Sequence, residues 1–117
     1  LEARRRARSR HRGDAAAQKR LGRLSLDSIR QEVQVDGQRI ELTAHELALV
    51  DALMQQPGRT VTKQRLFDTL YSWDHDANLS VIEVHVSRLR RKFEQAGAGV
   101  GIRMLRGLGY RLEAIDG

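Results

Sequence analysis

The sequence contains no cysteine, and it has no apolar run that approaches the roughly 18 residues of a membrane-spanning helix. The first absence excludes disulfides and thiolate metal sites, and it favours a cytoplasmic address. No stretch resembles a secretory signal peptide either, so we expect a soluble cytoplasmic protein. Because the chain opens on Leu1 and not on methionine, we also expect it to be a fragment whose upstream partner domain is missing.

Aromatic side chains are scarce: the 117 residues include two phenylalanines, two tyrosines and one tryptophan. They form no evident stacking platform, which disfavours general RNA binding, because unpaired bases are usually held by stacking on aromatic rings. A chain of this length can bury one core and is too short for two, so we expect one folded domain.

A converging catalytic site is absent as well. His45-Glu46 would begin a zinc-protease motif, but position 49 is leucine where that motif needs a second histidine. The glycines between residues 97 and 101 imitate a dinucleotide-binding loop, yet they follow a predicted helix and precede a predicted strand, the reverse of the order that phosphate binding requires. We therefore expect no enzyme activity, no metal site and no cofactor.

What the sequence does have is positive charge, formally +6 at pH 7, and this charge is unevenly distributed. Residues 1–23 hold nine basic and two acidic side chains, residues 24–84 five and ten, and residues 85–117 seven and three. The folded part is thus acidic in its first two thirds and basic at its C-terminal end, which is typical of a DNA-binding domain. Because residues 1–23 lack a core-forming pattern, we predict a basic linker there and the folded domain at residues 24–117.

Apolar residues alternate with polar ones over residues 24–26, 33–35 and 40–42, which predicts half-buried antiparallel strands. Asp36-Gly37 lies between the last two of these runs and predicts a tight hairpin. Two further strands are predicted at residues 102–106 and 110–113. They are joined by a glycine-rich turn, so the chain should end in a hairpin with an arginine at its tip, which is a wing.

Three helices are predicted between the strands. Thr43 and Glu46 satisfy the capping-box pattern, so the first helix should run from there to about Gln55, with a stripe at Leu47, Val50, Leu53 and Met54. Thr62 can cap a second helix that carries Leu66, Phe67 and Leu70. The third helix should run from Ser80 to Gln95. Its core-facing stripe is Ile82, Val86, Leu89 and Phe93.

The opposite face of the third helix carries Ser80, Val84, Ser87, Arg88 and Arg91, with Arg90 and Glu83 on one flank and His85, Lys92 and Val81 on the other. A charged face usually means only a solvated helix. Here few carboxylates balance the arginines, and Val84 stands among them, which makes sense if DNA bases are the neighbours. A guanidinium at Arg88 can bond guanine O6 and N7 together, so Arg88 is the first choice for direct readout.

At this point the sequence resembles the OmpR/PhoB-type effector domains of bacterial response regulators over about Leu24 to Glu113. The motifs that carry the resemblance are Leu42-Thr43 with Glu46-Leu47, Gly58-Arg59, Val61-Thr62, Glu83-Val84-His85-Val86 with Arg88-Leu89-Arg90, and Arg106-Gly107 with Gly109-Tyr110. The resemblance implies a winged helix-turn-helix of α+β class, with an N-terminal antiparallel four-stranded sheet, three helices and a C-terminal β-hairpin wing. The segment Tyr71-Ser72-Trp73-Asp74 is most similar to the subgroup that includes the QseB and PmrA regulators.

The resemblance also implies particular site residues. Base-facing positions fall on Val81, Glu83, Val84 and Arg88. Phosphate-facing positions fall on Ser80, His85, Ser87 and Arg90 or Arg91. Arg106 corresponds to the wing arginine that enters the adjacent minor groove, where narrow A·T tracts concentrate negative potential. Ser80 and Met104 depart from the residues common in relatives, which implies fewer phosphate contacts than usual.

Partners follow from the same resemblance. It implies double-stranded DNA with direct repeats, bound by a head-to-tail homodimer, and an upstream receiver domain that a sensor histidine kinase phosphorylates on aspartate. The loop with Tyr71, Trp73, Asp74 and His75 corresponds to a segment that relatives present to RNA polymerase, although Trp73 could equally be a loop anchor. The alternative from another class is a winged-helix module that docks an acidic protein partner.

Overall fold

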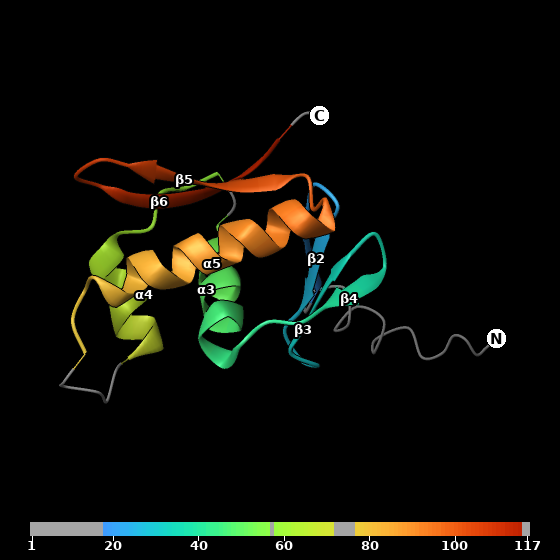
Figure 1. Ribbon diagram of the computed structural model, residues 1–117, viewed down its shortest axis with the longest axis horizontal. Coiled ribbons are helices and arrows are strands. Elements are labelled where there is room, and N and C mark those ends of the chain that lie inside the picture. The colour runs from blue at the N-terminus through green and yellow to red at the C-terminus, as the bar shows by residue number, and fades with distance from the viewer. Residues whose placement is uncertain (1–17, 57, 72–76, 116–117) are drawn as a thin grey trace.

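The structure, a computed structural model, describes residues 18–56, 58–71 and 77–115 (Figure 1). Its elements in chain order are β1 (Gln18–Leu21), β2 (Leu24–Asp27), β3 (Glu32–Val35), β4 (Gln38–Ile40), α3 (Ala44–Met54), α4 (Lys63–Leu70), α5 (Val81–Ala96), β5 (Val100–Leu105) and β6 (Gly109–Ala114). The described residues confirm the predicted α+β architecture, with a four-stranded antiparallel sheet, three helices and a C-terminal hairpin. Our predictions for residues 1–17 lie outside the described residues.

The N-terminal sheet has the strand order β1-β2-β3-β4, and each strand pairs antiparallel with the next. Period-two alternation buries Leu24 and Leu26 on β2 and Val33 and Val35 on β3, as predicted. The predicted tight hairpin joins β3 to β4: Asp36 and Gly37 both have positive φ, 52° and 82°, which suits a two-residue turn whose twist matches the strands.

The prediction of a linker over residues 1–23 is wrong for residues 18–21, which form β1 and pair along their whole length with β2. Leu21 is the single apolar residue of β1, and it packs against the core. Lys19 lies within 3.8 Å of the Asp51 carboxylate on α3. Pairing with an existing strand stabilises this polar segment, whose own side chains show no core-forming pattern.

The first two helices begin at the predicted caps. The Thr43 hydroxyl accepts the Glu46 amide, and Glu46 Oε1 accepts the Thr43 amide at 2.9 Å, so the capping box is complete. On α3 the buried stripe differs in part from the prediction: Leu49 is fully buried and Leu47 only half-buried. At the start of α4, the Thr62 hydroxyl accepts the Arg65 amide, as predicted.

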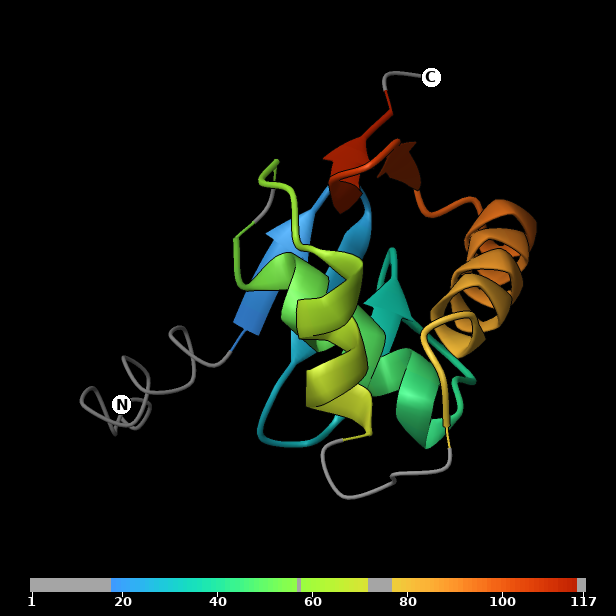
Figure 2. The same ribbon diagram turned by 90° about the vertical axis from the view of Figure 1, so that its left-hand side faces the viewer.

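Helix α5 and the hairpin form the C-terminal layer of the domain (Figures 1 and 2). The predicted stripe is confirmed, since Ile82, Val86, Leu89 and Phe93 are all buried. The hairpin runs beside α5, and its strand β6 forms an isolated bridge between Tyr110 and Val61 in the α3–α4 connection. Within the described residues, no helix has both the length and the apolar character to cross a bilayer.

Candidate nucleic-acid interface

The outward face of α5 is open along its length. Val84 is 45% exposed, and Ser87, Arg88 and Arg91 are exposed beside it. Neither Arg88 nor Arg91 has a hydrogen bond or ion pair within the part of the chain that the structure describes. Together with neighbouring side chains they line an open groove of about 820 Å³ that runs from Ser80 to Gln95. An apolar side chain thus faces solvent on the same face as two unpaired guanidinium groups, as predicted.

Glu83, the acidic member of the base-facing set, is paired inside the domain. Lys63, the first residue of α4, donates to Glu83 Oε2 at 2.7 Å. The hydrogen bond to Glu83 raises the pKa of Lys63 above its ordinary value. The negative charge of Glu83 is therefore balanced locally, and it does not neutralise the two exposed arginines.

The start of α5 positions the remaining members of this set. Asn78 Oδ1 accepts both the amide and the hydroxyl of Ser80, which is itself exposed. Val81 is half-buried and packs against the core, so only part of it faces outward.

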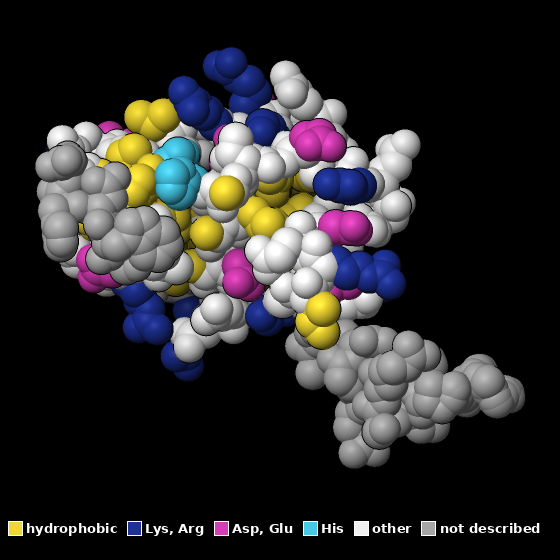
Figure 3. Space-filling model, turned by 90° about the horizontal axis from the view of Figure 1, so that it is seen from below, with side chains coloured by type: hydrophobic (Ala, Val, Ile, Leu, Met, Phe, Trp, Pro, Cys, Tyr) yellow, Lys and Arg dark blue, Asp and Glu magenta, His cyan; other side chains and the backbone are white. Residues whose placement is uncertain are grey.

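His85 does not lie on the open face, in contrast to the phosphate-facing position that the resemblance implies. It is 8% exposed, and its Nε2 lies 2.6 Å from the Tyr71 hydroxyl. The His45 ring lies 5.0 Å from the His85 ring, centroid to centroid. Burial, and then the neighbouring His45, lowers the pKa of His85, so the ring is neutral near pH 7. In Figure 3, histidine surface (cyan) adjoins apolar side chains on the face seen from below.

Tyr71 is the described member of the predicted polymerase-contact loop. It is half-buried, and its ring lies 4.5 Å from His45 and 5.4 Å from Phe67, centroid to centroid. It thus joins the end of α4 to α3 and α5. Trp73, Asp74 and His75 lie outside the described residues.

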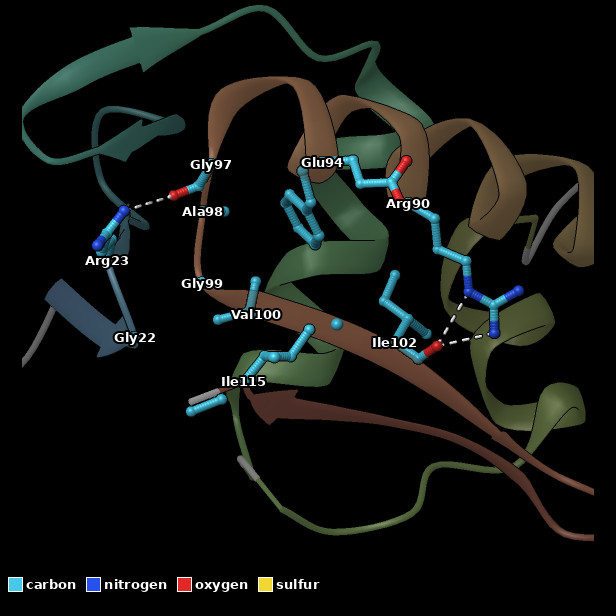
Figure 4. Close-up of a pocket in the computed structure, with 13 residues that line it drawn as sticks. Gly22, Arg23, Arg90, Glu94, Gly97, Ala98, Gly99, Val100, Ile102 and Ile115 are labelled. Carbon is cyan, nitrogen blue, oxygen red and sulfur yellow. Dashed lines mark hydrogen bonds between the residues drawn. The ribbon is translucent and has the colours of Figure 1, made fainter. Parts of the chain in front are cut away.

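Arg90 also departs from the phosphate-facing position. Its Nε and one terminal nitrogen both donate to the carbonyl oxygen of Ile102 on β5, at 3.0 and 2.7 Å. Figure 4 shows the side chain reaching from α5 to that carbonyl. Both arginines that the resemblance left open are exposed, but the Arg90 guanidinium is bonded to Ile102, whereas Arg91 has no such partner among the described residues.

The wing turn presents Arg106 to solvent between β5 and β6. Leu108, two residues further, is 63% exposed, and Met104 is exposed on β5. Gly107 has a φ of 78°, which lets the chain reverse at this point. Arg106 has no hydrogen bond or ion pair among the described residues, so its guanidinium is available to a ligand.

One interaction between α5 and the start of α3 was not anticipated from the sequence. Glu46 is 1% exposed, and its Oε1 accepts Lys92 Nζ at 2.6 Å as well as the Thr43 amide. Burial opposes ionisation of this carboxyl, but the hydrogen bond and charge of Lys92 and the hydrogen bonds with Thr43 together outweigh it and hold the pKa of Glu46 below its ordinary value. The capping box is a local signal for the Thr43 contact, whereas no sequence signal joins Glu46 to Lys92.

Three helices, an exposed basic face on the third and a hairpin beside it define a winged-helix domain. The chain belongs to the family of C-terminal domains of transcriptional regulatory proteins, whose family model (Transcriptional regulatory protein, C terminal) matches residues 37–112. These are the effector domains of OmpR/PhoB-type response regulators, so the predicted family is confirmed.

Curated relatives are response regulators about twice as long. The chain is 38% identical over 101 residues to response regulator protein PmrA of Pseudomonas aeruginosa, covering 86% of this chain and 44% of PmrA. It is 36% identical over 105 residues to transcriptional regulatory protein BasR of Escherichia coli, covering 90% and 46%. The chain therefore spans less than half of each relative.

Solved structures agree with the fold. The DNA-binding domain of CpxR from E. coli superposes with a TM-score of 0.73 at 30% identity, covering 85% of this chain and 98% of that domain. The DNA-binding domain of the response regulator AdeR, crystallised in complex with an intercistronic region, gives a TM-score of 0.73 at 27% identity, covering 82% and 99%.

Proposed function

We propose that this domain binds double-stranded DNA sequence-specifically, with α5 in the major groove and the wing turn at the adjacent minor groove. The observation that carries the proposal is the pair of exposed, unpaired guanidinium groups of Arg88 and Arg91 beside Val84, among the described residues. An arginine can read guanine, and a valine can pack on a thymine methyl group. The two carboxylates that line the same groove, Glu83 and Glu46, are each engaged by a lysine.

The phosphate backbone has its own candidate contacts in this proposal. Ser87 and Arg91 are exposed along one side of α5 and can donate to phosphate oxygens, whereas the Ser80 hydroxyl already donates to Asn78 Oδ1. His85 and Arg90 are not included, because their ring and guanidinium groups are bonded within the domain. The proposed contact set is thus smaller than the one that the resemblance implied.

The rest of the regulator enters the same proposal. The AdeR domain in complex with an intercistronic region supports DNA as the partner, and the longer relatives support an upstream receiver domain. We propose that a sensor histidine kinase acts through that receiver and that two copies bind direct repeats head to tail. A tether between two copies would raise the effective concentration of the second. We also propose RNA polymerase as the partner of the segment that begins at Tyr71. None of these roles requires a catalytic step.

The direct test begins with selection of bound duplexes from a random library, followed by measurement of an affinity for every base substitution in the selected site. Arg88→Ala is expected to weaken the selected site by about 1–3 kcal/mol and to flatten base preference at one position. Arg59→Ala removes the same charge from the α3–α4 connection, on the side of the molecule away from α5 (Figure 2), and is the matched control.

Two outcomes would contradict this proposal. If Arg88→Ala leaves preference unchanged at every base, Arg88 does not read the major groove. If the wild-type domain binds selected and random duplexes with equal weak affinity at all salt concentrations, a protein-docking role replaces DNA recognition.

The contribution of Arg106 to DNA affinity is expected to depend on the base pairs that flank the selected site. Because its guanidinium is exposed at the wing turn, Arg106→Ala should reduce affinity most when A·T tracts flank the selected site, where a narrow minor groove attracts arginine. Affinities for duplexes with the same central site and either A·T or G·C flanks provide the measurement. Equal losses on both flanks would argue against a minor-groove contact.

A further inference from the structure

Arg90 and the two exposed arginines lie close together in the sequence but point in different directions. Successive residues of a helix are about 100° apart, so Arg91 lies roughly 60° from Arg88 around the axis, whereas Arg90 lies roughly 160° from it. Arg88 and Arg91 can therefore share the open face, and Arg90 cannot. Its guanidinium instead reaches the hairpin, where it donates twice to the Ile102 carbonyl.

The Ile102 carbonyl lies on the edge of β5 that does not pair with β6. Strand β5 pairs with β6 in a two-stranded sheet, so within the described residues its other edge has no neighbouring strand. Ile102 is 5% exposed, and a buried carbonyl without a donor is costly. The charge-assisted bonds from Arg90 satisfy this group and cover the edge. Figure 4 shows this link at one end of the pocket between α5 and β5.

Other polar links hold the hairpin to different parts of the domain. Tyr110 exchanges two backbone hydrogen bonds with Val61, and Leu112 accepts the amide of Gly58, so β6 is attached to the α3–α4 connection. Arg90 is the only α5 side chain that hydrogen-bonds to the hairpin in the described part of the chain. The direct polar link between the recognition helix and the wing is therefore this one side chain.

The link acts at a distance from the wing turn. Arg106 follows Ile102 by four residues, or about 13 Å along an extended strand. A rotation of the hairpin by about 15° around the link would displace the turn by about 3 Å, more than the distance range of a hydrogen bond allows. Without Arg90, the bonds of β6 to Gly58 and Val61 would remain as the hydrogen bonds between the hairpin and the rest of the described domain, and a wing that rotates about them would lose contacts that a fixed wing can make.

We propose that Arg90 is a positioning residue, which fixes the wing relative to α5 so that the major-groove and minor-groove contacts form together. This role rests on the proposed DNA-binding function. The resemblance implied a phosphate contact for Arg90 or Arg91. In this proposal Arg90 bonds inside the domain, and Arg91 is the one that contacts phosphate.

The first experiment requires no DNA. Because the sequence has no cysteine, spin labels can be attached to Gln95→Cys on α5 and Leu108→Cys at the wing turn, both exposed in the wild-type protein. The distance distribution between the labels is expected to broaden in Arg90→Ala and to stay narrow in Arg59→Ala. It should recover in part in Arg90→Lys, which has one donating nitrogen in place of the two that Arg90 uses. An unchanged distribution in Arg90→Ala, with the domain folded, would overturn the proposal.

The second experiment measures affinity for the selected site with A·T or G·C flanks. Arg90→Ala is expected to lose roughly tenfold with A·T flanks and little with G·C flanks, and the double variant with Arg106→Ala should bind no worse than Arg106→Ala alone. Equal losses on both flanks, additive with Arg106→Ala and with a shallower salt dependence, would instead make Arg90 a phosphate contact and overturn its positioning role. A third outcome is a broadened label distribution in Arg90→Ala together with equal losses on both flanks in Arg106→Ala. It would contradict the proposed minor-groove contact of Arg106, but it would still show that Arg90 fixes the hairpin relative to α5.

Discussion

Replacing Gly109 with alanine is expected to lower the free energy of unfolding by about 4 kcal/mol. Gly109 is buried at the start of β6 with a φ of 152°, a region that side chains rarely adopt. A Cβ there would lie 2.1 Å from the carbonyl oxygen of Val61 and 2.8 Å from Thr62 Cα, and both atoms belong to the backbone. The bridge between Val61 and Tyr110 would have to open, and the wing would separate from the α3–α4 connection. Urea denaturation followed by circular dichroism measures the loss.

Gly107→Ala provides the matched control two residues away. Gly107 also has a positive φ, 78°, but a Cβ at this position would meet no atom within 4 Å. The substitution should therefore cost only backbone strain, about 1 kcal/mol. Equal losses in the two variants would mean that backbone strain, and not the close approach of Val61, determines the need for glycine at position 109.

Lys92→Met is expected to lower the free energy of unfolding by about 3 kcal/mol near pH 7, because it leaves the buried Glu46 carboxylate with the Thr43 amide as its remaining donor among the described residues. Helix α5 would also lose its ionic link to the start of α3. Lys63→Met removes the lysine of the more exposed pair with Glu83, and it should leave the free energy of unfolding nearly unchanged.

The cost of Lys92→Met should depend on pH. In the wild type the pKa of Glu46 is held below its ordinary value of 4.5, so this group contributes stability above that pH and loses it as the pH falls through the folded pKa. Without Lys92, burial dominates and the folded pKa rises, so the variant is penalised above the raised pKa and relieved below it. Denaturation curves between pH 4 and pH 7 should thus converge at the acidic end. A constant difference across this range would assign the role of Lys92 to packing alone.

Much of the fold could be predicted because its signals are local. Thr43 and Glu46 are three residues apart and bond each other, and Asp36-Gly37 adopts the positive φ values that a two-residue hairpin demands. The stripe from Ile82 to Phe93 follows from helical spacing alone. The same spacing correctly placed Val84, Arg88 and Arg91 on the open face of α5.

The features that the sequence pattern did not predict each depend on a partner outside the segment's own pattern. Strand β1 forms because β2 offers a partner, although its own side chains are mostly polar. A helical wheel places His85 and Arg90 on the flanks of α5. It does not include Tyr71, which hydrogen-bonds to His85, or the Ile102 carbonyl, which accepts hydrogen bonds from Arg90.

The sequence by itself determined where the helices and turns begin, which face of α5 is apolar, and where positive charge accumulates, since each of these depends on neighbours within a few residues. The tertiary structure decided which of the polar side chains remain free for a ligand. Lys63, Lys92 and Arg90 each bond a group that is 12 to 46 residues away. Whether such a group is satisfied inside the domain depends on how the helices and the hairpin pack, which no local pattern encodes.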